Sequence, residues 1–254
     1  MFNSWGGTDA QPYAQVRINV GPTPDPWAKA GVMFRDSTAP GSRMVMVAQG
    51  PNNEVFMQWR TATGGGAGGG SRIGGTDAVK WVKLTKTGSS FTGSYSLDGS
   101  TWTPIGTQAF TSVSDAYLGG LAVTAHNNST TYTQAFTNVS IAGISPTSLT
   151  DIDIGSPAVA GSATFADSTW KVTGGGDDIW GNADQFNYAY TSVSGDQTII
   201  AKVGTNTAVA TNVIDVGKNN HLLLTRPYSG PSGTASITIQ TPVGYNNTAY
   251  FNPA

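Results

Sequence analysis

Acidic residues and a tryptophan are concentrated in GGGDDIWGNADQF, residues 174–186, in a chain that is otherwise poor in charge. The carboxylates of this segment are Asp177, Asp178 and Asp184. Together with backbone carbonyls next to the glycines, they can supply the hard oxygen ligands that calcium prefers. The same composition is typical of a turn, in which Asp and Asn bind their own backbone and Trp180 closes the core edge. The segment therefore predicts either a calcium site or a turn between two strands.

Catalytic patterns are weak elsewhere. Most glycosidases use a pair of carboxylates, and Glu54 is the only glutamate in the chain. Asp151 and Asp153 alternate, but they fall in a segment that reads as a linker. His126 and His221 are the only histidines and no Gly-x-Ser-x-Gly motif occurs, so a serine triad is not expected. A glycoside hydrolase with an aspartate pair stays as a minor alternative to a non-catalytic protein.

Composition excludes several classes of partner. Charged residues make up 11% of the chain and the formal net charge is −2, so the sequence has no basic patch for nucleic acid. No apolar run is long enough for membrane insertion, and MFNSWGGTDA lacks the features of a signal peptide. Cysteine is absent, which excludes disulfides and thiolate metal sites. The low charge and the many Thr, Asn and Gly residues favour an extracellular or cell-surface bacterial protein.

Short alternating or apolar runs bounded by Gly, Pro, Asn and Asp predict an all-β chain with no helices. The clearest expected strands are 13–20, 30–36, 43–49, 54–61, 79–88, 91–97, 117–125 and 133–142, followed by several in 162–240. Within the run 79–88, Trp81 alternates with Val79 and is expected to point toward the core. The glycine-rich segment 63–75 lacks the Lys-Ser/Thr of a phosphate-binding loop and predicts a mobile surface loop.

Several segments resemble a known family as a set. They are DPWAKAGVMFRDSTAPGSRMVMVAQGPN, WVKLTKTGSSFTGSYSLDGSTWTPIG and YLGGLAVTAHNNSTTYTQAFTNVSI. These look like the middle and end of a concanavalin A-like, laminin-G-like β-sandwich module, which accompanies secreted bacterial polysaccharide-active and surface proteins. Residues 153–203 look like the beginning of the same module, so the order is inverted. The resemblance implies a concanavalin-like jelly-roll sandwich.

The inverted order leads to two hypotheses about how the sandwich is completed. Residues 153–203 can fold back onto the main body at 1–143, across a linker at 144–152, as a circular permutation. Alternatively, neighbouring chains exchange these strands and form a homopolymer by strand donation. We favour the first arrangement because intramolecular closure has the higher effective concentration. Residues 204–254 are expected to be a β-rich extension that the resemblance does not cover.

Polysaccharide binding is the function that the residues favour, because sugar rings stack on exposed aromatic side chains while polar groups bind the hydroxyls. Trp5, Trp27 and Trp59 are the candidate stacking residues. We therefore expect an extracellular, non-catalytic carbohydrate-binding or adhesion module, with calcium as a possible cofactor. The alternative from another class is a self-assembling filament subunit of a bacterial surface.

Overall fold

A computed structural model describes residues 24–74, 80–112 and 115–204, together with the backbone of strands 15–19, 211–215 and 237–240. The chain divides into two units, Pro24–Asn206 and the combination of Met1–Thr23 with Thr207–Ala254. In the second unit, β1 (Gln15–Asn19) pairs with β16 (Thr211–Asp215) on one side and with β17 (Ile237–Gln240) on the other, both antiparallel. Trp5 and His221 lie outside the described residues.

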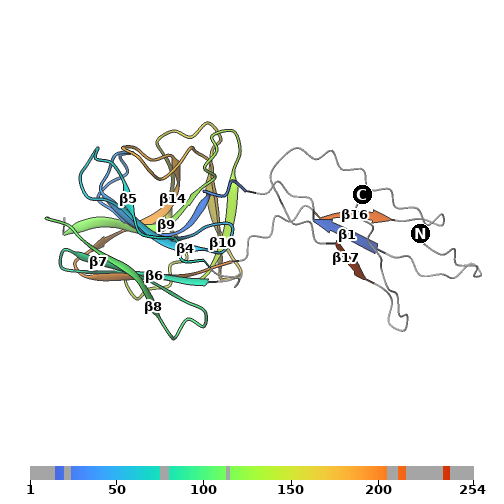
Figure 1. Ribbon diagram of the computed structural model, residues 1–254, viewed down its shortest axis with the longest axis horizontal. Helices are drawn as coiled ribbons and strands as arrows, with labels where there is room; N and C mark the ends of the chain where they lie inside the picture. The colour runs from blue at the N-terminus through green and yellow to red at the C-terminus, as the bar shows by residue number, and fades with distance from the viewer. Residues whose placement is uncertain are drawn as a thin grey trace, which may run out of the picture. The chain divides into compact units, whose positions relative to one another are not determined.

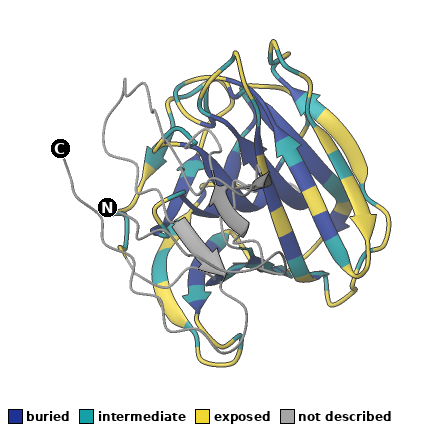
Figure 2. Ribbon diagram, turned by 90° about the vertical axis from the view of Figure 1, so that its right-hand side faces the viewer, coloured by how far each residue is buried: buried dark blue, intermediate teal, exposed yellow. Residues whose placement is uncertain are grey.

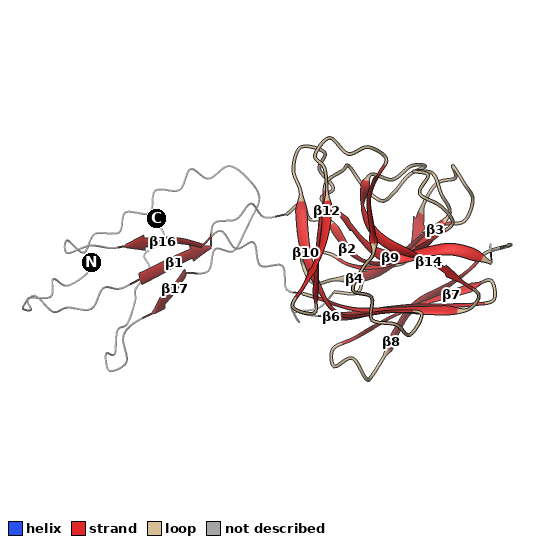
Figure 3. Ribbon diagram, turned by 180° about the vertical axis from the view of Figure 1, so that it is seen from behind, coloured by secondary structure: helices blue, strands red, loops and turns tan. Residues whose placement is uncertain are grey.

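The unit Pro24–Asn206 is a sandwich of two antiparallel sheets with 7 strands each (Figures 1 and 3). Sheet 1 has the order β11 (Thr150–Ile154), β14 (Phe186–Ser194), β9 (Ala116–Thr124), β2 (Lys29–Arg35), β3 (Met44–Gln49), β4 (Val55–Arg60) and β5 (Gly68–Gly69). Sheet 2 has the order β12 (Ser162–Ala166), β13 (Thr169–Gly174), β10 (Tyr132–Ile141), β15 (Gln197–Val203), β6 (Lys80–Thr87), β7 (Ser90–Ser96) and β8 (Thr103–Ala109). The described residues contain no helix long and apolar enough to cross a bilayer. The all-β sandwich expected from the sequence is therefore confirmed.

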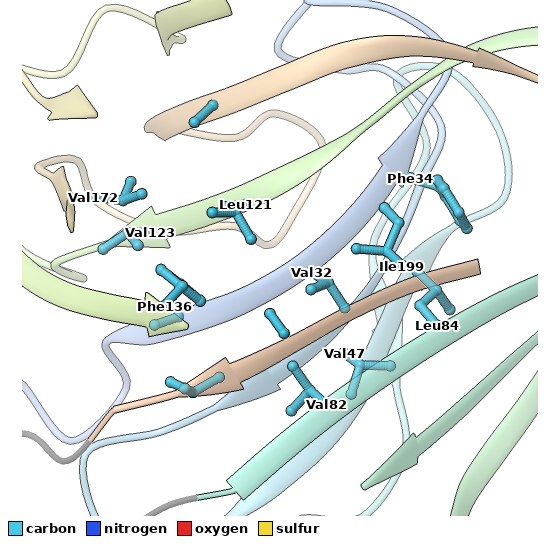
Figure 4. Close-up of a cluster of buried hydrophobic side chains, with 14 of the residues drawn as sticks. Val32, Phe34, Val47, Val82, Leu84, Leu121, Val123, Phe136, Val172 and Ile199 are labelled. Atoms are coloured by element: carbon cyan, nitrogen blue, oxygen red, sulfur yellow. The ribbon is translucent and has the colours of Figure 1, made fainter. Parts of the chain in front are cut away.

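A core fills the space between the two sheets. Val32 of β2, Val47 of β3 and Leu84 of β6 are fully buried and point toward one another (Figure 4). The two-residue period of a strand places these side chains on one face. In β6 the intervening Lys83 is polar, whereas the intervening Met33 of β2 and Met46 of β3 belong to a second apolar cluster on the other face of sheet 1. Figure 2 shows strands along which buried and exposed positions alternate in this way. Burial of this apolar face is the main favourable contribution to folding.

The strands of 150–203 complete both sheets within the same chain. In sheet 1, β14 pairs with β9 from Asn187↔Val123 to Ser194↔Ala116. In sheet 2, β15 lies between β10 and β6. The structure thus has the intramolecular arrangement. The predicted linker at 144–152 already contains the start of β11 at Thr150.

The glycine-rich segment is partly a strand rather than a free surface loop. Gly68 and Gly69 form β5 and pair with Trp59 and Gln58 of β4. A Cβ atom at Gly68 would lie 3.0 Å from the Trp59 Nε1 atom, which is closer than nearly all real Cβ contacts. A side chain at this position would force the Trp59 ring to shift by a few tenths of an ångström, a packing constraint that composition alone does not reveal.

Candidate functional site

The acidic segment lies across the outer face of sheet 1, the face turned away from sheet 2. We call residues 175–185 the strap. Ile179 of the strap is fully buried in a second apolar cluster on this face. The Gln58 side chain donates to the Ile179 carbonyl at 2.7 Å, and the backbone N–H of Ala67 donates to the Gly181 carbonyl at 2.8 Å. The strap is therefore a packed covering of the sheet rather than a simple connection between strands.

Asp184 anchors the strap through buried ion pairs. Its Oδ1 and Oδ2 atoms accept from Arg60 at 2.6 and 2.9 Å, and Oδ2 also accepts from Arg35 at 3.2 Å. All three side chains are fully buried in these pairs. Burial lowers the pKa of Arg35, and the charge of Asp184 opposes that shift. Both carboxylate oxygens of Asp184 are thus engaged by guanidinium groups.

The two other aspartates of the strap have different surroundings. Asp178 forms an ion pair with Lys29, and its Oδ1 accepts from the N–H of Ile179 at 2.7 Å. Burial lowers the pKa of Lys29, and the Asp178 charge opposes this shift. Asp177 is exposed. The three predicted ligands therefore do not converge, and no group of three or more His, Cys, Asp or Glu residues within the described ranges is arranged to hold a metal ion.

Trp27 is the predicted sugar-stacking residue that the structure exposes most, with 53% of its surface accessible. It lies in the turn before β2, where its own N–H donates to Asp25 Oδ1 at 2.8 Å and the N–H of Ala28 donates to the Asp25 carbonyl at 2.9 Å. The Arg72 guanidinium lies 4.3 Å from the ring centroid. The ring is held at the surface by its turn and is stacked against a cation.

Polar side chains surround this tryptophan. His126 Nδ1 lies 2.9 Å from Asp25 Oδ1, and Nε2 lies 3.4 Å from Asp178 Oδ2. The His126 Nδ1 atom is buried but has no aligned hydrogen bond with a described residue. The side chains of Asp25, His126 and Asp178 are 25–31% exposed. We call Asp25, Trp27, Arg72, His126 and Asp178 the Trp27 site.

Antiparallel pairing explains why these distant residues meet. Lys29 at the start of β2 is opposite Thr124 at the end of β9, so the turn with Trp27 and the turn with His126 lie at the same end of sheet 1. His126 has a φ of 52°, in the left-handed region, which turns the chain sharply after β9. The strap then brings Asp178 to the same end of sheet 1, where it pairs with Lys29. The site is therefore assembled from three separate parts of the chain.

The carboxylates near this end of the sandwich are engaged in structural contacts. Glu54 pairs with Arg72. Asp151 and Asp153, which alternate on β11, both accept from the Asn187 side-chain amide, at 2.8 and 3.2 Å. The alternating pair is thus part of a strand and not of a linker. These contacts support a structural role for Asp151 and Asp153 in joining strands, whereas the minor hydrolase hypothesis assigns an aspartate pair a catalytic role.

The other predicted stacking residue that the structure describes is Trp59, which has different surroundings. Trp59 is partly buried, packs against the core between the sheets and lies close to Gly68. Arg72 and Asp25 were not expected in a site. Asp25 could have been found from the Asp-Pro-Trp sequence, because an Asp two residues earlier commonly caps a turn. Arg72 could not, because only the path of the glycine-rich segment brings it to Trp27.

Comparison of the chain with protein-family models, curated proteins and solved structures gives no match. The resemblance to concanavalin A-like modules therefore depends on the sequence segments themselves.

Proposed function

We propose that this protein is an extracellular, non-catalytic module that binds polysaccharide at the Trp27 site, in a carbohydrate-binding or adhesive role. The observation that carries the proposal is the exposed ring of Trp27, held at the end of the sandwich where β2 begins, beside partly exposed polar side chains. An exposed, well-supported tryptophan next to hydrogen-bonding groups is what a sugar ring requires, since its apolar face stacks and its hydroxyls need partners.

The charges of the site favour a ligand without net charge. Arg72 is paired with Glu54, and Lys29 is paired with Asp178. His126 lies between the carboxylates of Asp25 and Asp178. Because the charges of Arg72, Lys29 and Asp178 already have opposite neighbours, the site offers a ligand hydrogen bonds rather than an unpaired cation. This supports a neutral glycan as the ligand of the Trp27 site.

The test is affinity electrophoresis of the full chain through gels that contain neutral polysaccharides, such as a β-glucan, xylan, mannan or starch, followed by titration of the one that retards it. We expect Trp27→Ala to weaken binding about tenfold or more, because the stacking surface is lost. Trp180→Ala is the matched control, since Trp180 is 45% exposed but is not part of the Trp27 site.

Equal weakening by the two substitutions would show that general loss of surface tryptophan, rather than the Trp27 site, determines retention. Retention of the wild-type chain by none of the neutral polymers would overturn the proposal.

A further inference from the structure

The outer face of sheet 2 has an unusual distribution of charge. No Asp or Glu occurs in any strand of this sheet. Its lysines are Lys80, Lys83, Lys86, Lys171 and Lys202. Burial in β6 alternates, so that Val82 and Leu84 enter the core while Trp81 and Lys83 point to the outer face. The expectation that Trp81 points to the core is wrong, because it would have placed Lys83 in the core as well.

Neighbouring strands add to the same face. Lys202 of β15 is directly opposite Trp81 of β6, and Ile200 is opposite Lys83. Lys171 lies on β13, which is separated from β15 by β10 alone. Since neighbouring strands are about 4.8 Å apart and alternate residues of one strand about 7 Å apart, these side chains cover one continuous area. We call Trp81, Lys83, Trp102, Lys171 and Lys202 the lysine–tryptophan face.

Two of these cations lie near indole rings. The Lys83 ammonium is 4.0 Å from the centroid of the Trp102 ring, and the Lys202 ammonium is 6.0 Å from that of Trp81. The hairpin at 97–100 supports the second ring, because a Cβ atom at Gly99 would lie 2.7 Å from Trp81. The rings and the cations are therefore presented together on a sheet surface.

Lys83, Lys171 and Lys202, the cations of this face, have no ion pair with any described residue. Elsewhere in the described sandwich, carboxylates pair with Lys29, Arg35, Arg43, Arg60, Arg72 and Lys86. Lys80 donates to the Asn53 carbonyl at 2.6 Å. No such partner is found within the described ranges for Lys83, Lys171 or Lys202, and these three lysines share one face.

We infer that the lysine–tryptophan face binds an acidic polysaccharide whose sugar rings carry carboxylates, such as a polyuronate. The ammonium groups pair with ligand carboxylates, while the two tryptophans offer apolar surface to the sugar rings. This inference does not depend on the Trp27 site, which lies at the ends of the interior strands β2 and β9 of sheet 1 and favours a neutral ligand. A nucleic acid is the competing polyanion, and the experiment below distinguishes it from an acidic polysaccharide.

The experiment is biolayer interferometry of the full chain on immobilised polygalacturonate at low ionic strength, with dextran as the neutral surface and oligothymidine as the nucleic acid. The key variant is Lys83→Gln/Lys202→Gln. We expect it to weaken polygalacturonate binding about three- to thirtyfold, as two partly exposed ion pairs would. Arg43→Gln is the control, because it removes a positive charge that is paired with Asp36 away from this face, and we expect less than a twofold effect.

Three results would overturn the inference. These are no binding of the wild-type chain to polygalacturonate, equal weakening by Arg43→Gln and the double variant, or tighter binding to oligothymidine than to polygalacturonate. Trp27→Ala, which tests the neutral site, is expected to leave polygalacturonate binding unchanged, so that failure of one hypothesis is distinguished from failure of the other. Thermal unfolding of each variant shows that the fold is retained.

Discussion

At the scale of single residues, Asp184 is a buried charge that holds the strap on sheet 1. It is a residue of the strap and lies between two arginines that are 149 and 124 residues away in the chain. We expect Asp184→Asn to lower the free energy of unfolding by about 3–5 kcal/mol, because both arginines lose their buried counter-charge. Urea unfolding of the purified variant measures this loss.

Asp177→Asn is the control for that experiment, since Asp177 is exposed on the same strap. We expect it to change stability by less than about 0.5 kcal/mol. Equal effects of the two substitutions would contradict a specific role for the buried pairs.

Asp98 predicts a dependence of stability on acid pH. Its carboxylate accepts from the N–H groups of Thr101 and Ser100 at 2.7 Å each and from the Ser96 hydroxyl at 2.9 Å. These bonds hold the pKa of Asp98 well below its ordinary value of 3.8. Because the pKa of Asp98 is lower in the folded state, the stabilisation by its carboxylate is complete at pH values above the ordinary pKa of 3.8. It is lost as the pH falls through the lower pKa of the folded protein.

The variant Asp98→Asn tests this, since asparagine cannot titrate. We expect wild type to be the more stable protein at neutral pH and the difference between the two to shrink as the pH falls below 3.8. Chemical denaturation at several pH values gives the difference directly. A difference that is constant with pH would show that the Asp98 charge has no part in holding the hairpin.

At the scale of elements, Asp151 and Asp153 of β11 protect the edge of β12. The Asp151 carboxylate accepts from the N–H of Ala163 at 3.0 Å, and that of Asp153 accepts from the N–H of Gly161 at 2.9 Å. Unpaired backbone groups at a sheet edge invite pairing with another chain, and these carboxylates occupy two of them. The pair thus joins the two sheets and blocks one route to self-assembly.

Asp151→Ala/Asp153→Ala is therefore expected to destabilise the sandwich by about 1–3 kcal/mol and to promote association between copies. Light scattering across a concentration series measures the association. Asp167→Asn, in the turn between β12 and β13, is the control and keeps a residue that tolerates the φ of 48° at this position. A strictly monomeric double variant would show that other features protect the edge.

At the scale of the whole molecule, the sandwich depends on strands from both ends of its sequence. We expect residues 24–206 to fold alone, because both large sheets are complete within that unit. Residues 24–143 lack β14 and β15, which leaves β9 without one partner and removes the strand between β10 and β6. We therefore expect the shorter fragment to remain unfolded or to aggregate.

Circular dichroism and a two-dimensional amide NMR spectrum of each fragment test this expectation. Dispersed amide signals from 24–206 and collapsed signals from 24–143 are the predicted results. A folded 24–143 fragment would contradict the view that the later strands complete the sheets.

Local pattern by itself determined the strands of this protein. The alternation of apolar and polar residues in segments such as 91–97 and 133–142 has the two-residue period of a half-buried strand, and the structure has β7 and β10 there. The inverted order of the resembling segments also predicted that 153–203 would pair with the earlier strands. Exposure of Trp27 follows from its place in a proline-flanked turn.

Only the tertiary structure decided which distant residues meet. The neutralisation of Asp184 by Arg35 and Arg60, the approach of Arg72 to Trp27 and the shared face of Lys83, Lys171 and Lys202 all depend on which strands are neighbours. A local pattern shows which side of a strand is buried, but not the partner on each edge, because pairing between distant strands is set by packing of the whole sandwich. The acidic segment predicted either a calcium site or a turn from its sequence, and in the fold it is a covering of sheet 1 that Asp184 anchors through Arg35 and Arg60.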